Sequence, residues 1–305
     1  MKIRSVLLAT VCVAALLQHE PTAAGMRNSK DLTLSCRLAK TIYAEAEPVL
    51  AFLSVKNRGK SVRCIPSGLN CGIGLQVVSL EGGERLMPPR WMDSSWGDGL
   101  QANIGPGETF AAVLDPLTTY GDYRRGAGSI ADRLGGSALP PGRYRLISSL
   151  TVRETNGKKG GAYERVQGNA VDFAVVPLED DTSSAQLVGA FLRSASWRDG
   201  EYVARSKYCA DWVPRFYSSG FLPTVFRASG SHMKEEPLGA LLSALRANGA
   251  SDIMRANILQ TRLIIHPGGG ELRVLLEQIA EYELTGPTAE IIGTWATRVA
   301  RPNAE

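Results

Sequence analysis

The sequence predicts a multidomain fold in which an all-β sandwich is followed by an all-α domain of stacked helical hairpins. Up to residue 178, short apolar runs alternate with polar residues and are separated by Gly, Pro and Asn, which is typical of strands and turns. From residue 183 onward, apolar residues recur with a helical period. The length of 305 residues agrees with about two domains, which we place at 29–178 and 183–300.

The first 24 residues have the three parts of a secretory signal peptide. The basic head Met1–Arg4 precedes the apolar run Ser5–Leu17, and the small residues Thr22–Ala24 form a cleavage signal. The run is shorter than the roughly 20 residues that span a bilayer, and no later segment reaches about 18 apolar residues. We therefore expect a signal peptide at 1–24, a periplasmic or secreted protein, and no membrane span in the mature chain.

Six strands can be placed in the first part of the chain. In the first, Leu32, Leu34 and Cys36 alternate with polar residues, which predicts one buried face. The second is dense in β-forming residues and ends at the turn 56–59. The dipeptide Asn156-Gly157 marks a loop between the last two strands. The expected ranges are 31–38, 49–55, 74–80, 109–114, 143–153 and 170–176.

Five motifs lie along these strands and their turns. They are Tyr43-x-x-x-Glu47-Pro48-Val49, Asn57-x-Gly59, Pro106-Gly107-Glu108, Pro141-Gly142-Arg143-Tyr144-Arg145-Leu146 and Asn169-Ala-Val-Asp-Phe173. The series resembles an immunoglobulin-like (Ig-like) module that is common in exported bacterial proteins and also occurs in the family named for an intracellular proteinase inhibitor. The resemblance covers 29–178 and implies an Ig-like sandwich. It implies no single function, because such modules serve as inhibitors, spacers, adhesive units and accessory domains.

The chain departs from the usual module at one turn and in two insertions. Ala46 stands where a turn glycine is usual, and the insertions are Met87 to Gly105 and Leu117 to Leu139. None of the motifs allows an inhibitory residue to be assigned to this chain.

Six helices are expected in the second part, at 183–195, 199–218, 236–248, 250–266, 270–284 and 287–300. A weak repeat, in which 189–192 aligns with 239–242, favours three stacked hairpins. The alternative is that any pair of amphipathic helices has leucines at such spacing. Between the helices, 218–234 is punctuated by Gly and Ser and is expected to be a loop, partly occupied by 221–226.

Cysteine usage agrees with export to an oxidising compartment. We expect one disulfide between Cys64 and Cys71, which flank a short loop, and a second between Cys36 and Cys209 that would join the two domains. The alternative is a zinc site. That site would need closely paired ligands, and beyond the leader the chain has only His232 and His266 as imidazole ligands.

Charge and motifs exclude several classes of function. The formal net charge is +4, with Lys and Arg interspersed among Asp and Glu, so nucleic acid is not an expected partner. The sequence has no nucleophile elbow, zinc-protease helix, phosphate loop or dinucleotide fingerprint. Ser231-x-x-Lys234 matches the core of serine acyltransferases, but its companion motifs are absent. We therefore expect no catalytic residue, no cofactor and no metal.

The two insertions hold the aromatic and basic residues that we predict to bind a partner. Aromatic rings stack on sugars or anchor proteins, and Arg is frequent beside them. The alternative is that the insertions fold back and bury their rings against the sandwich. The candidate residues are Trp91, Trp96, Tyr120, Tyr123, Arg124 and Arg125.

The sequence thus favours a non-catalytic exported protein that binds a protein or an envelope polymer. Two alternatives stay open. One is an exported hydrolase with an acidic cleft in the helical domain, and the other is a protease inhibitor.

Overall fold

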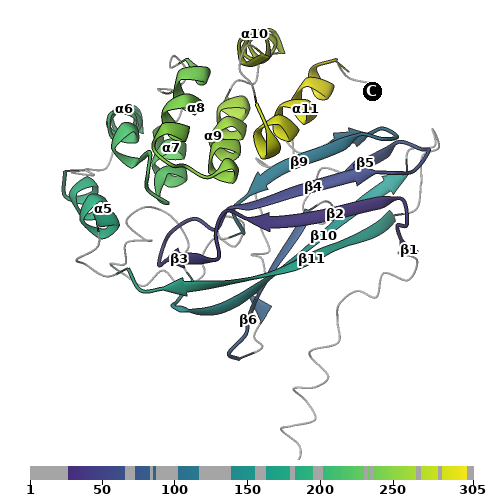
Figure 1. Ribbon diagram of the computed structural model, residues 1–305, viewed down its shortest axis with the longest axis horizontal. Helices are drawn as coiled ribbons and strands as arrows, with labels where there is room; N and C mark the ends of the chain where they lie inside the picture. The colour runs from purple at the N-terminus through teal and green to yellow at the C-terminus, as the bar shows by residue number, and fades with distance from the viewer. Residues whose placement is uncertain are drawn as a thin grey trace, which may run out of the picture.

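The computed structural model shows three layers: a row of helices, a three-stranded sheet and an eight-stranded sheet (Figure 1). Strands come first along the chain and helices follow, as predicted. The structure describes residues 27–65, 73–82, 85–86, 102–116, 139–154, 163–178, 183–194, 202–229, 233, 237–265, 269–280 and 284–300.

The eight-stranded sheet is built around the long antiparallel pair β10 and β11, in which Tyr144 lies opposite Phe173. β6 and β5 pair with successive stretches of β10, while β7 and β8 continue the sheet beyond them. β1 and β3 run parallel to β11. The bounds are β1 Arg27–Asn28, β3 Ile42–Ala44, β5 Arg63–Ile65, β6 Ile73–Ser79, β7 Arg85–Leu86, β8 Ala102–Ile104, β10 Gly142–Glu154 and β11 Tyr163–Val176.

The three-stranded sheet lies in the middle of the molecule, in the order β2 (Leu32–Leu38), β4 (Ala51–Asn57) and β9 (Thr109–Leu114). The strand β2 alternates buried and exposed residues, which confirms the one buried face expected from its sequence. β4 and β9 are instead buried on both faces along most of their length. Both strands are rich in apolar residues, as such strands require, since one face packs on the other sheet and the opposite face packs on the helices.

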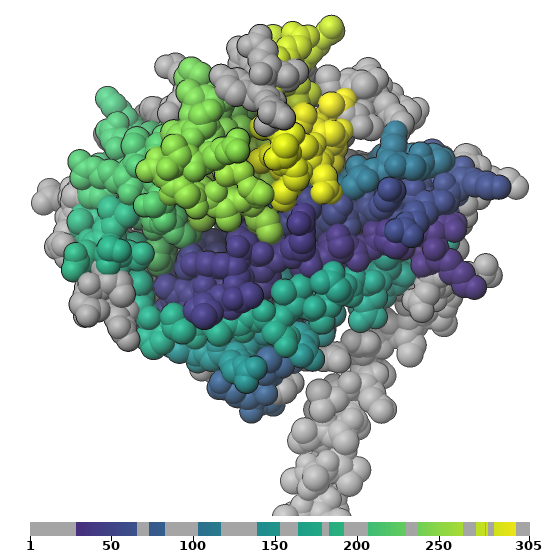
Figure 2. Space-filling view, in the orientation of Figure 1, coloured from purple at the N-terminus to yellow at the C-terminus, as the bar shows by residue number. Residues whose placement is uncertain are grey.

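The helices cover the outer face of the three-stranded sheet (Figure 2). α9 and α11 contact β9, and α7 packs beside α9. On the other side of this inner row, α6 packs on α7, α8 on α9, and α10 on both α11 and α8. The bounds are α5 Ser183–Ser194, α6 Tyr202–Trp212, the short 3₁₀ helix η2 Val213–Phe216, α7 Leu222–Ser229, α8 Leu238–Ala247, α9 Asp252–Ile265, α10 Gly269–Ala280 and α11 Gly286–Ala300.

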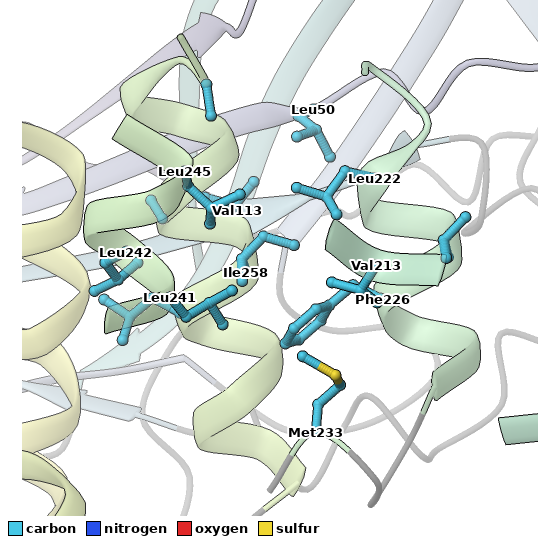
Figure 3. Packing of buried hydrophobic residues seen from close by; sticks show 14 of the residues in the cluster. Leu50, Val113, Val213, Leu222, Phe226, Met233, Leu241, Leu242, Leu245 and Ile258 are labelled. Atoms are coloured by element: carbon cyan, nitrogen blue, oxygen red, sulfur yellow. The ribbon is translucent and has the colours of Figure 1, made fainter. Parts of the chain in front are cut away.

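Strands and helices share one hydrophobic core. Leu50 and Val113 belong to the same buried cluster as Leu222 and Ile258 of the helices, and Figure 3 shows them among these side chains. A second cluster fills the space between the two sheets. Because burying a large aliphatic side chain contributes about 2 kcal/mol, the shared cluster holds the helical layer firmly on the sheet.

Two side-chain amides cover the two free edges of the three-stranded sheet. On β2, Asn169 accepts from the N–H of Cys36 at 2.7 Å and donates to its carbonyl at 2.8 Å. On β9, Gln260 accepts from the N–H of Val113 at 2.7 Å and donates to its carbonyl at 2.8 Å. Each amide makes the two hydrogen bonds that a neighbouring strand would make. Thr294 accepts a further bond from the N–H of Ala111 at 2.8 Å.

The six expected strands and six expected helices are all present, with shifted ends. One expectation is wrong: 218–234 is not simply a loop, because it contains the helix α7, whose apolar side is buried. The Gly and Ser residues that indicated a loop mark the turns around this short helix. β1, β3, β5, β7 and β8 were not expected, because strands of two or three residues have too little periodicity to be recognised.

Ala46 is the one described residue other than glycine with a positive φ, of 66°. It occupies the turn between β3 and β4. A left-handed conformation favours glycine, because a Cβ raises the energy of this backbone region by about 1 kcal/mol. Separately, none of the described helices is long and apolar enough to cross a membrane.

Candidate functional site

The insertions that hold the predicted binding residues begin and end at strands of the sandwich. The first leaves the eight-stranded sheet after β7 and returns at β8. The second leaves after β9 and returns before β10, and its flanking residues Asp115, Pro116 and Leu139 are buried. The predicted residues themselves, Trp91, Trp96, Tyr120, Tyr123, Arg124 and Arg125, lie outside the described residues.

A buried carboxylate lies at the end of the sandwich where the second insertion begins. Glu47 is only 4% exposed and follows the β3–β4 turn. Its Oε2 accepts a hydrogen bond from the N–H of Ala44 at 2.8 Å, and its Oε1 forms an ion pair with Lys40. A buried charge needs such partners, because removing a carboxylate from water is costly unless it is paired and hydrogen-bonded.

The same carboxylate lies against the helical layer at Gly220, in the turn before α7. A Cβ added to Gly220 would lie 1.5 Å from Oε1 and 2.3 Å from Cδ of Glu47. Only a residue without a side chain allows this approach. Lys40, Tyr43, Glu47 and Gly220 therefore form a contact between sandwich and helices, which we call the Glu47 junction.

Tyr43 is the third ionisable group of the junction and is 1% exposed. Burial raises the pKa of its phenol well above the ordinary value, and the negative charges of Glu47 and Asp115 raise this pKa further. The Lys40 ammonium lies 5.2 Å from the centre of the ring, a cation–π distance. Tyr43 is therefore a neutral phenol at physiological pH.

The Glu47 junction has a structural role. A general base needs a pKa near the working pH, and the raised pKa of the Tyr43 phenol lies far above it. The Glu47 carboxylate is engaged by Lys40 and the backbone of Ala44. These groups join the turn between β3 and β4 to the helical layer.

Carboxylates of the helices also serve packing. Glu290 accepts a hydrogen bond at 2.6 Å from the hydroxyl of Ser54, which ties α11 to β4. On the exposed surface, Asp252 pairs with Arg255 and Glu277 pairs with Arg273. Among the described residues, no group of three or more His, Cys, Asp and Glu is placed to hold a metal ion.

The expected disulfide between Cys36 and Cys209 is not formed. Cys36 lies on β2 in the cluster between the sheets, whereas Cys209 lies on α6 in the cluster between sheet and helices. The middle sheet thus separates the two side chains. Cys64 is buried on β5, and its expected partner Cys71 lies outside the described residues, so that pairing stays a prediction.

The buried free thiol of Cys36 makes the stability of the protein depend on pH. Burial raises the pKa of its thiol to about 11 from 9.0. Between these values the unfolded chain loses a proton that the native protein retains, so stability must fall as pH rises. Between pH 8 and 10.5 we expect a loss of about 2 kcal/mol in the free energy of unfolding that is absent from Cys36→Ala. Urea titrations of both proteins measure it; identical pH profiles would contradict it.

No protein-family model matches the sequence, and no curated protein matches it. The structure is similar to the CARDB domain of a Pyrococcus furiosus protein, solved in complex with di-metal ions, with TM-score 0.23 and 15% identity over 49% of this chain and 94% of that one. It is also similar to the sporulation control protein Spo0M from Bacillus subtilis, with TM-score 0.25 and 15% identity over 57% and 59%. Likenesses at these TM-scores carry no argument about ligands or activity.

Sequence reasoning missed the Glu47 junction. Glu47 appeared only as part of a turn motif, and Gly220 lay in a segment expected to be a loop. The available signal was the combination of an acidic residue directly after a strand turn and a glycine between two apolar helical segments. That signal is weak, because nothing in the sequence indicates that the two residues meet.

Proposed function

We propose that this chain is an exported, non-catalytic binding protein whose sandwich is an Ig-like module. Its partner is a protein or an envelope polymer, bound by the insertions Met87 to Gly105 and Leu117 to Leu139. The observation that carries this proposal is that the residues flanking the second insertion are buried: Asp115, Pro116 and Leu139. Recognition loops are effective when a rigid scaffold holds both of their ends.

The scaffold supports this role because its layers cannot separate easily. Hydrogen bonds join α9 and α11 to β9 and β4 through Gln260, Thr294 and Glu290. The Glu47 junction joins the turn between β3 and β4 to the segment before α7. A rigid support reduces the entropy lost when an insertion orders around its partner. The leader at 1–24 supports an extracytoplasmic location for the encounter.

The test is affinity capture from a cell-envelope extract by the wild-type protein and by Trp91→Ala/Trp96→Ala. Because large aromatic side chains dominate binding energy at interfaces, we expect the double substitution to lower recovery of the partner at least tenfold. The matched control is Ile264→Ala/Val274→Ala, which removes two apolar side chains that are 42% and 52% exposed on α9 and α10. Equal recovery by wild type and the tryptophan variant would refute binding by the first insertion.

A further inference from the structure

Four exposed cations gather at the end of the sandwich opposite the Glu47 junction. Lys56, Arg58 and Lys60 lie in or beside the turn that connects β4 to β5, and Lys30 precedes β2. The two segments are in contact, because the N–H of Arg58 donates to the carbonyl of Asp31 at 2.7 Å. We call Lys30, Lys56, Arg58 and Lys60 the basic tip. None of the four forms an ion pair with another residue that the structure describes.

Asn57 holds the turn of the basic tip in one conformation. Its side chain is fully buried, and Nδ2 donates to the carbonyls of Ser61 and Ile104, both at 2.9 Å. Its Oδ1 accepts from the N–H of Gly59 at 2.9 Å. The cations flanking Asn57 are therefore presented by a rigid turn, and only their own side chains lose freedom on binding.

The acidic residues near the basic tip are engaged elsewhere. Arg63, which is buried, lies 3.3 Å from Asp31 and 3.8 Å from Glu164, so its single positive charge offsets one of their two negative charges. Glu108 accepts a hydrogen bond from the N–H of Gly105 at 2.6 Å. The four cations of the basic tip together with Arg63 outnumber the three carboxylates by two, so the net charge of this end is positive.

We propose that the basic tip binds the anionic headgroups of a phospholipid bilayer. Figure 2 shows this purple and blue end of the sandwich projecting beyond the helical layer, a convex shape that suits a flat surface better than a polymer chain lying in a groove. The large exposed apolar side chains of the described residues lie elsewhere, at Ile42, Leu80, Val176, Ile264 and Val274. Binding is therefore electrostatic, without insertion into the hydrocarbon. Each cation near an anionic bilayer contributes to attraction, and salt screens that attraction.

Co-sedimentation with vesicles tests the proposal. We compare vesicles of phosphatidylcholine alone with vesicles of phosphatidylcholine and phosphatidylglycerol in a 2:1 ratio, using the chain that starts at residue 25. We expect binding to the anionic vesicles only, with a fall of about tenfold when NaCl is raised from 50 to 250 mM. Replacing Lys30, Lys56, Arg58 and Lys60 by Gln should lower binding at least tenfold.

The control separates the basic tip from net charge. Replacing Arg143, Lys207, Arg246 and Arg273 by Gln removes the same charge from exposed positions on β10, α6, α8 and α10, and should change binding less than threefold. Equal losses in the two variants, or equal binding to both kinds of vesicle, would overturn the proposal. So would wild-type protein that ignores the vesicles but binds soluble polyphosphate, since the partner would then be an anionic polymer.

Discussion

Replacing Gly220 with Ala should lower the free energy of unfolding by about 3–5 kcal/mol. The new methyl group would lie 1.5 Å from Oε1 of Glu47, which is far closer than two non-bonded atoms can approach. Relief requires the carboxylate to move away from Lys40 and the N–H of Ala44. Because Lys40 is 45% exposed, its ion pair contributes little; the cost comes from the buried carboxylate that loses its hydrogen bond, about 1–3 kcal/mol, and from the extra volume in a packed site, about 1–3 kcal/mol. Urea denaturation of wild type and variant measures the difference.

Two further variants make this expectation specific. Gly293→Ala is the matched control, because a Cβ there meets nothing within 4 Å and lies in α11, where Ala is favoured over Gly by about 1 kcal/mol. The same substitution should thus stabilise at one site and destabilise at the other. In a Glu47→Ala background, Gly220→Ala should lose most of its effect. If its cost were undiminished there, contact with Glu47 would not be the cause.

Replacing Gln260 with Leu should lower the free energy of unfolding by about 2–4 kcal/mol. The substitution leaves the N–H and the carbonyl of Val113 buried without their partners, and each such group costs about 1–3 kcal/mol. Thermal and urea denaturation measure the loss. Gln167, which is exposed on β11, is the control, and Gln167→Leu should change stability by less than about 0.5 kcal/mol.

The variant Gln260→Glu adds a pH dependence to the same test. An ionised carboxylate can accept from the N–H of Val113 but faces its carbonyl oxygen, so the neutral acid is favoured and its pKa rises in the folded protein. Its stability relative to wild type should therefore fall as pH rises from 4 to 7 and recover on acidification. A pH-independent difference would show that the amide does not donate to Val113.

The order of elements could be predicted because it depends on local pattern. The alternation of Leu32, Leu34 and Cys36 shows on which face β2 is buried, since successive side chains of a strand point to opposite sides. The helix period is equally local, and it located α5, α8, α9 and α11 to within a few residues. Where the pattern is short, as in β3 or α7, the same reasoning failed.

The candidate site could be predicted much less well. The insertions were recognised as departures from the module that the sequence resembles, but the surface that they present depends on tertiary structure, which residue order does not describe. The basic tip was hidden for another reason: Lys30 is separated along the chain from the turn 56–60, and a hydrogen bond between Arg58 and Asp31 brings the segments together. Charge counted along the chain showed only an even mixture.

By itself, the sequence determined that strands precede helices, that β2 has one buried face and that β4 is dense in β-forming residues. Only the tertiary structure decided what covers β4 and β9, which residues close the sheet edges and which cysteines are kept apart. The reason is distance along the chain: Gln260 is 147 residues from Val113, and Asn169 is 133 residues from Cys36. Backbone geometry imposes a local period on the sequence, whereas a single long-range hydrogen bond leaves no period to detect.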